Sequence, residues 1–135
     1  MRKIILPLIA LLSIAALSAS ALPPPEKDEM TISELAANKF SMEGKIIETE
    51  ITNASNFEQT APGKYRAWCY YYKGIGIGSS EMVYIPEEGK EFFKELAEKD
   101  TLGGGSTETV YLQVKDGKFT AVGTRFKKSK GIYTW

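Results

Sequence analysis

Apolar and polar residues alternate in several short segments of the chain, which is the pattern of β-strands with one buried face. The segments with this alternation are 45–52, 65–73, 82–85, 110–115 and 118–124. Two other segments, 31–38 and 86–100, space their apolar residues as a helix does. The pattern predicts a mainly β domain of five strands. It also predicts a short helix before the first strand and a second helix between the third and fourth strands.

The last two strands can be paired residue by residue. Asp116-Gly117 is a two-residue turn of the kind that closes tight β-hairpins, and it sets Lys115 opposite Lys118. Cross-strand partners share a face, so this register predicts which side chains form a wall of the core. They are Val110, Leu112, Val114, Phe119, Ala121 and Gly123.

The second predicted strand, 65–73, is the richest in aromatic residues, and its two faces differ in size. Ala67 and Cys69 are small. The opposite face carries larger side chains, namely Arg66, Trp68, Tyr70 and Tyr72. The interior of a small barrel has little room, so we expect the small face inside and the aromatic face outside, where a ligand reaches it. The alternative is that the N-terminal helix or the C-terminal tail covers these aromatics as a second core.

Other segments are expected to lack regular structure. The polar stretch 53–63 ends in Pro62-Gly63 and is predicted to be a loop. Residues 22–30 combine three prolines with mixed charges and are predicted to form a stiff, solvated leader. The glycine-rich stretch 74–80 is expected to be a flexible hairpin connection. Residues 129–135 end the chain as a tail, within a basic and aromatic segment that starts at Arg125.

The N-terminus has the features of a secretory signal peptide. Arg2 and Lys3 precede the apolar run 4–17, and Ala19-Ser20-Ala21 is a small-residue cleavage site. We therefore expect removal of residues 1–21, no stable membrane insertion afterwards, and a periplasmic or secreted protein. Without Arg2 and Lys3, the 17 basic residues become 15 against 17 acidic ones. That balance provides no overall attraction to nucleic acid or anionic lipid.

Composition excludes several kinds of chemistry. The 135 residues include no histidine and one cysteine, so Ser-His-Asp and Cys-His catalysis, His-ligated zinc and an internal disulfide are all ruled out. We expect no enzymatic activity, no metal and no cofactor. Glu48 and Glu50 share one strand face at a spacing of roughly 7 Å, which leaves a carboxylate-dependent hydrolase as the weakest alternative.

The order of elements resembles that of the oligonucleotide/oligosaccharide-binding (OB) fold. The lead-in 32–38, followed by Met42-Glu43-Gly44-Lys45, is also similar to the entry of small exported bacterial OB-fold-like domains. The resemblance covers residues 31–128. It implies a five-stranded Greek-key barrel whose second and third strands bind oligonucleotides or oligosaccharides.

The sequence predicts a non-catalytic binding module that uses the outward aromatic face of the second and third strands for a protein or peptide partner. Binding of an oligonucleotide or oligosaccharide on the same face is the alternative. A groove for phosphates is disfavoured by four acidic residues in the first strand and the following stretch. They are Glu43, Glu48, Glu50 and Glu58. The predicted ligand-binding residues are Arg66, Trp68, Tyr70, Tyr72, Lys73, Tyr84 and Arg125.

Overall fold

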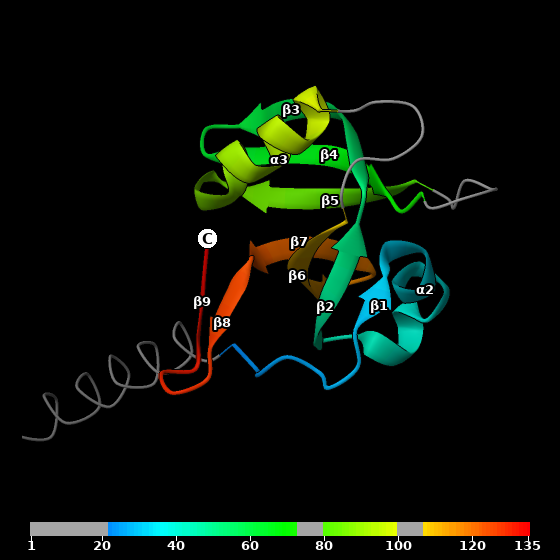
Figure 1. Ribbon diagram of the computed structural model, residues 1–135, viewed down its shortest axis with the longest axis vertical. Coiled ribbons are helices and arrows are strands. Elements are labelled where there is room, and N and C mark those ends of the chain that lie inside the picture. Colours follow the sequence, from blue (N-terminus) through cyan, green and yellow to red (C-terminus); the bar gives the residue numbers. More distant parts are fainter. Residues whose placement is uncertain (1–21, 73–79, 100–106) are drawn as a thin grey trace, which may run out of the picture.

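The computed structural model describes residues 22–72, 80–99 and 107–135, and this part of the chain is mainly β (Figure 1). The strands of one large mixed sheet are β1 (Met30–Thr31), β2 (Ile46–Ile51), β3 (Asn53–Ala61), β4 (Lys64–Tyr70), β5 (Glu81–Pro86), β6 (Glu108–Lys115) and β7 (Lys118–Gly123). A second, two-stranded sheet consists of β8 (Arg125–Lys127) and β9 (Ile132–Thr134). The helices are α2 (Ile32–Ala37) and α3 (Lys90–Glu98), together with the 3-10 turns η1 (Lys39–Met42) and η2 (Glu87–Gly89). The expected mainly β class and both expected helices are confirmed.

The large sheet has the order β1-β2-β6-β7-β5-β4-β3. Its β1–β2 and β5–β7 pairs are parallel and the other pairs are antiparallel. Only Thr52 separates β2 from β3, and it is held to the end of β4 by its backbone N–H, which donates to the Tyr70 carbonyl at 3.0 Å. Residues 46–61 thus form one bent stretch that pairs with β6 through its first part and with β4 through its second part.

The hairpin register read from Asp116-Gly117 is confirmed. Val114 pairs with Phe119 and Leu112 with Ala121. Both turn residues have positive φ, 55° and 72°, as a turn of type I′ requires. The Glu43 carboxylate accepts hydrogen bonds from both turn N–H groups, at 2.8 and 3.1 Å, and so links this turn to the start of β2.

The loop predicted over residues 53–63 is wrong, because most of this stretch is strand β3. Its polar composition reflects an edge position, where many side chains face solvent, and two register irregularities interrupt its pairing with β4. Asn56 has a positive φ of 52° at the first irregularity. Phe57 supplies the apolar contact by stacking on Tyr65, with 5.4 Å between ring centroids. Within this stretch, only the predicted turn at Pro62-Gly63 is confirmed.

The solvated leader and the C-terminal tail are also corrected. Pro25 forms a parallel bridge with Ile46, and the Glu26 N–H donates to the Ile46 carbonyl at 2.8 Å, so the segment before β1 packs along β2. At the other end, β8 and β9 form a hairpin where a free tail was expected. Both segments form backbone pairing that their own sequence patterns do not predict.

The core lies between the sheet and the two helices. Thr31 caps α2 in a reciprocal arrangement with Glu34, and the helix buries Ile32 and Leu35. Helix α3 buries Phe93 and Leu96 in the same cluster as the inward side chains of the strands. Trp135 packs against helix α3, with its ring centroid 6.2 Å from that of Phe93.

Gly123 permits the C-terminal hairpin to approach β7, and its replacement gives a testable result. A Cβ at this position would lie 2.7 Å from the backbone oxygen of Thr134 in β9, and backbone cannot rotate away as a side chain does. We expect Gly123→Ala to lower the free energy of unfolding by about 1–3 kcal/mol and to expose the β8–β9 hairpin to trypsin. Urea unfolding and limited digestion measure both effects. Val122→Ala, on the outward side of the same strand, is the control and should leave the digestion pattern unchanged.

Candidate functional site

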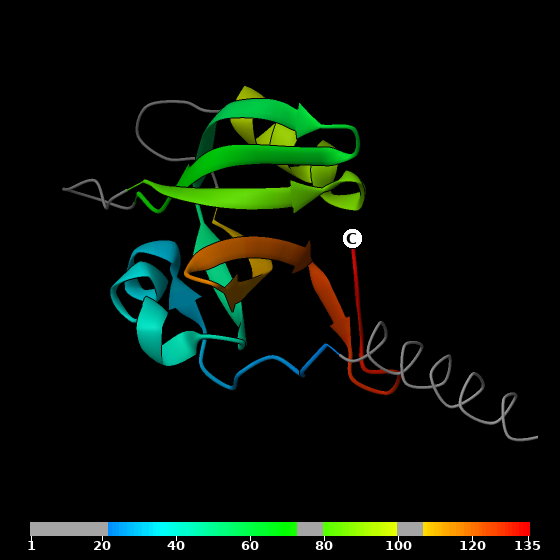
Figure 2. The same cartoon turned by 180° about the vertical axis from the view of Figure 1, so that it is seen from behind.

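The outward side of β4 and β5 carries the candidate site. On β4, Arg66 and Trp68 lie directly opposite Tyr84 and Met82 of β5. We call these four residues the aromatic face. Helix α3 lies on the other side of the same strands, in front of them in Figure 1 and behind them in Figure 2. The aromatic face is therefore not covered by α3.

Burial confirms which side of β4 faces inward. Ala67 and Cys69 are fully buried, while the Trp68 side chain lies on the opposite side with 39% of the residue exposed. The alternative of a second core over these aromatics required a cover from the N-terminal helix or the chain's end. Helix α2 contributes to the central core, and Trp135 packs on Phe92 and Phe93. Trp68 thus stays accessible.

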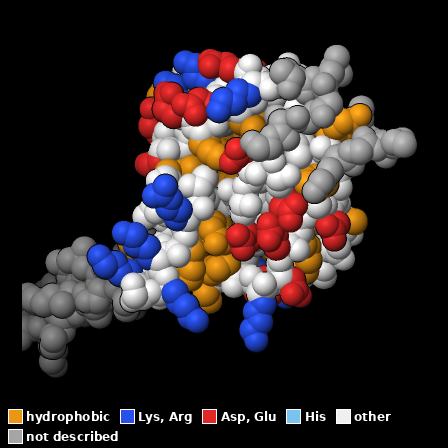
Figure 3. All heavy atoms as spheres, in the orientation of Figure 1, with side chains coloured by type: hydrophobic (Ala, Val, Ile, Leu, Met, Phe, Trp, Pro, Cys, Tyr) orange, Lys and Arg blue, Asp and Glu red, His pale blue; other side chains and the backbone are white. Residues whose placement is uncertain are grey.

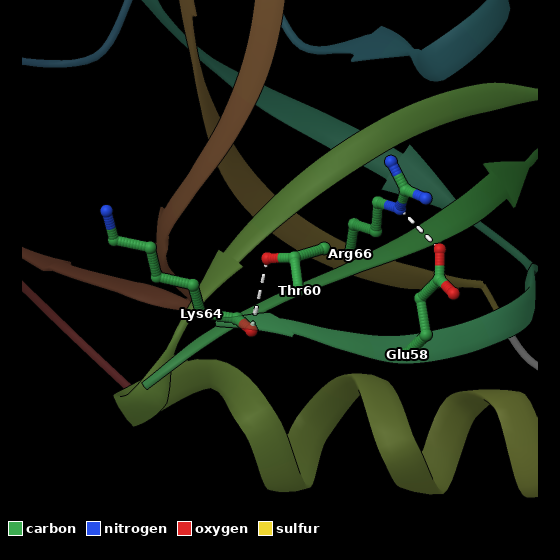
Figure 4. Close-up of polar contacts among 4 residues, drawn as sticks. All are labelled: Glu58, Thr60, Lys64 and Arg66. Atoms are coloured by element: carbon green, nitrogen blue, oxygen red, sulfur yellow. Dashed lines mark hydrogen bonds and ion pairs between the residues drawn. The ribbon is translucent and has the colours of Figure 1, made fainter. Parts of the chain in front are cut away.

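Arg66 of the aromatic face and the neighbouring Lys118 both have partners. Arg66 donates from Nε to the Glu58 carboxylate of β3, and both side chains point away from the helix beneath the sheet (Figure 4). This hydrogen bond is the main reason that the pKa of Arg66 is raised. Lys118 of β7 lies over the Tyr84 ring, with Nζ 5.6 Å from its centroid. The face combines apolar area with an arginine whose charge Glu58 balances and a lysine that lies over an aromatic ring.

The adjoining turn is held by a hydrogen bond from a side chain to the backbone. The Thr60 hydroxyl donates to the Lys64 carbonyl at 3.3 Å, next to the Arg66–Glu58 pair (Figure 4). This contact ties β3 to the start of β4. The position of Arg66 is consequently set by two strands.

The structure does not bring all predicted site residues together. Tyr70 lies at the end of β4, opposite Asn53, and Tyr72 follows it with its N–H bonded to the Thr52 hydroxyl at 2.7 Å. Both are half-buried and flank the aromatic face rather than form its centre. Arg125 lies on β8, where it pairs with Thr134 in the separate hairpin. Lys73 lies outside the described residues.

Three residues of this surface were not predicted as part of it. Alternation already places Met82 on the outward side of its strand. Glu58 was missed because its segment has the composition of a loop. Lys118 reaches Tyr84 only because β5 and β7 pair in parallel, with Tyr84 beside Thr120, and that pairing between distant segments has no local signal.

Three other observations concern reactive groups and cavities among the described residues. Burial raises the pKa of the Cys69 thiol well above its usual range, which keeps it protonated and inert. Within the described ranges, no three potential metal ligands gather into a group. A hollow of about 130 Å³ beside α3, lined by Phe92 and Glu108 among others, is smaller than the usual cavity for a small-molecule substrate.

Comparisons of the chain with protein-family models, with curated proteins and with solved structures found no match. No helix in the part of the chain that the structure describes is long and apolar enough to span a bilayer. The functional argument therefore starts from the geometry of the aromatic face.

Proposed function

We propose that this chain is an exported, non-enzymatic binding module whose aromatic face docks a protein or peptide partner. The observation that carries the proposal is the exposed indole of Trp68 among Arg66, Met82 and Tyr84. Tryptophan, tyrosine, methionine and arginine are the residue types enriched in the cores of protein interfaces. An accessible tryptophan among half-buried neighbours has the form of a binding hot spot.

Two further features favour a partner that lies on the face itself. Glu58 balances the charge of Arg66, so a polyanion finds no unpaired arginine at the centre of the surface. The neighbouring edge strand β3 is interrupted twice in its register, and such bulges disfavour the addition of another strand. The partner's side chains, rather than its backbone, would then make the principal contacts.

A second candidate function follows from the strand path. We infer a partly open, OB-fold-like barrel, because the bent stretch 46–61 pairs with β6 through its first part and with β4 through its second part. In that fold the outward side of the second and third strands, here β4 and β5, binds oligonucleotides or oligosaccharides. Base or sugar stacking on Trp68 and Tyr84 would be its chemical basis.

Crosslinking in the exporting cell separates these functions. A photoreactive residue at Met82 should give a discrete, protease-sensitive adduct with another protein, whereas the same residue at exposed Lys94 of α3 should not. Purified protein should bind neither an oligothymidylate nor a glucan oligosaccharide. Oligothymidylate binding that weakens steeply with salt would favour the second function, as would saturable oligosaccharide binding. Equal labelling from both positions would contradict the proposed docking face.

Export has its own test. Cleavage after Ala21 should give a protein that begins Leu-Pro-Pro-Pro, because the small residues at 19 and 21 fit the signal-peptidase site. N-terminal sequencing of the protein recovered outside the cytoplasm measures this. An intact Met1 in the membrane fraction would contradict the expected processing.

A further inference from the structure

The β8–β9 hairpin is a second surface feature, and the binding function proposed above does not use it. Its inner side is fixed by an aromatic cluster in which Tyr133 lies 4.7 Å from Phe126 and 5.3 Å from Tyr111, measured between ring centroids. Gly131 closes the hairpin with a positive φ of 63°. The hairpin is thus a braced projection whose outer side chains are held in a defined place.

Those outer side chains are strongly basic. The exposed cations of this segment are Arg125, Lys127, Lys128 and Lys130. Residues 125–135 contain no acid, and none of the ion pairs found among the described residues involves these cations. Without them and without Arg2 and Lys3, eleven of the 17 basic residues remain against 17 acidic ones. The hairpin is therefore a positive end on an otherwise negative domain.

The charge separation is visible on the molecular surface. Figure 3 shows lysine and arginine side chains gathered over the hairpin, acidic side chains elsewhere on the same face, and an apolar patch between them. Burial raises the pKa of Tyr111, and the negative charges of Glu48 and Glu29 raise it further. Glu48 of β2 is the cross-strand partner of Tyr111, so the acidic side of this face adjoins the aromatic cluster. Such a distribution orients the domain at a negatively charged surface.

The hairpin also lies where the described chain begins. The Tyr133 hydroxyl donates to the Pro23 carbonyl at 2.7 Å. Burial, followed by the proximity of Tyr111, raises the pKa of Tyr133 to about 12, so this donor keeps its proton at neutral pH. Leu22 and Ile132 are both exposed, at 42% and 43%, and add apolar side chains at this end. The described chain therefore starts from the basic end of the domain.

We propose that the β8–β9 hairpin is a docking surface for an anionic lipid membrane. The four cations would lie against the headgroups, and Ile132 would enter the interface. The proposal rests in part on the proposed export segment, residues 1–21, because that segment would deliver the domain across a membrane. The charge argument is independent of that segment. Phe126 and Tyr133 are engaged in the cluster, so the hairpin offers no free aromatic platform for nucleic-acid bases.

Vesicle binding tests this proposal on the protein recovered after export. One variant replaces Lys127, Lys128 and Lys130 with glutamine. The control carries the same three changes at Lys64, Lys94 and Lys99, which are exposed lysines of β4 and the α3 region. Each lysine near an anionic surface contributes about 1 kcal/mol, or roughly fivefold. Partitioning into vesicles of equal phosphatidylglycerol and phosphatidylcholine should fall on the order of a hundredfold for the hairpin variant. It should change little for the control.

Three outcomes would overturn the proposal. The first is equal vesicle binding by the hairpin variant and the control variant. The second is equal binding of the unmodified protein to pure phosphatidylcholine vesicles and to the vesicles that contain phosphatidylglycerol. The third is a hairpin variant that keeps vesicle binding but loses binding to an oligonucleotide, to an acidic protein or to a second copy of the chain. Ile132→Ser should weaken vesicle binding without a change in charge. N-terminal sequencing tests export separately, so either idea can fail without the other.

Discussion

Replacing Phe119 with alanine is expected to lower the free energy of unfolding by about 3–5 kcal/mol. Phe119 is 3% exposed and pairs with Val114 across the confirmed hairpin. Its parallel neighbour is Val83 of β5, so this side chain joins the two halves of the sheet. The truncation leaves a cavity at that junction, and close-packed neighbours relax into such a cavity only in part. Chemical denaturation of the purified protein measures the loss.

Thr120→Ala is the matched control for this substitution. Thr120 lies on the same strand, one residue further and on the half-exposed side, next to Tyr84. Its loss should cost far less than the loss of Phe119, because no buried volume is removed. Similar losses for the two variants would mean that the register from Asp116-Gly117 does not describe the folded protein.

Short-range pattern was sufficient for most of the elements that build the core. The turn at Asp116-Gly117 determined a register, and the register determined which side chains are buried, down to Val114 opposite Phe119. The contrast between Ala67 and Trp68 likewise predicted the inward side of β4. In both cases the alternation of side-chain size and polarity has a direct physical consequence, since successive residues of a strand point to opposite faces.

The errors fall in segments whose own composition does not show the pairing they make in the fold. Strand β3 lies at the edge of the sheet, so most of its polar side chains face solvent and give it the composition of a loop. The segment around Pro25 finds hydrogen bonds on β2, and the hairpin that ends in Thr134 rests on Gly123. The segment around Pro25 pairs with a distant strand, whereas β3 and β8 pair with the strands that follow them, β4 and β9. Periodicity within a window does not report such partners.

The residues of the candidate site likewise divide into those that the sequence pattern predicted and those that it missed. Trp68, Arg66 and Tyr84 were predicted because alternation alone places them outward. Glu58 and Lys118 complete the surface through β3, which pairs with β4, and through β7, which pairs with β5 across a long stretch of sequence. Arg125 was grouped with the site because of its charge, yet its strand belongs to the separate hairpin. Charge and residue type identified candidates, and topology decided which of them share a surface.

Trp68→Ala is expected to weaken partner binding by about 2 kcal/mol or more, roughly thirtyfold, with little change in melting temperature. With 39% of the residue exposed, Trp68 contributes less to packing than a buried aromatic, so its removal leaves no closed cavity. The yield of the protein adduct from a photoreactive residue at Met82, compared at equal and unsaturated expression, measures the binding loss. A thermal melt of the same variant measures stability.

Phe40→Ala distinguishes a specific docking face from general hydrophobic adhesion. Phe40 is 92% exposed on η1, outside the aromatic face, so its removal subtracts an equally apolar surface group at another place. The adduct yield from Met82 should stay unchanged in this variant if binding occurs through the aromatic face. A comparable loss for Phe40→Ala and Trp68→Ala would indicate nonspecific contact. A large drop in melting temperature for Trp68→Ala would instead identify Trp68 as a structural side chain, because hot-spot residues at an open face contribute to recognition more than to folding.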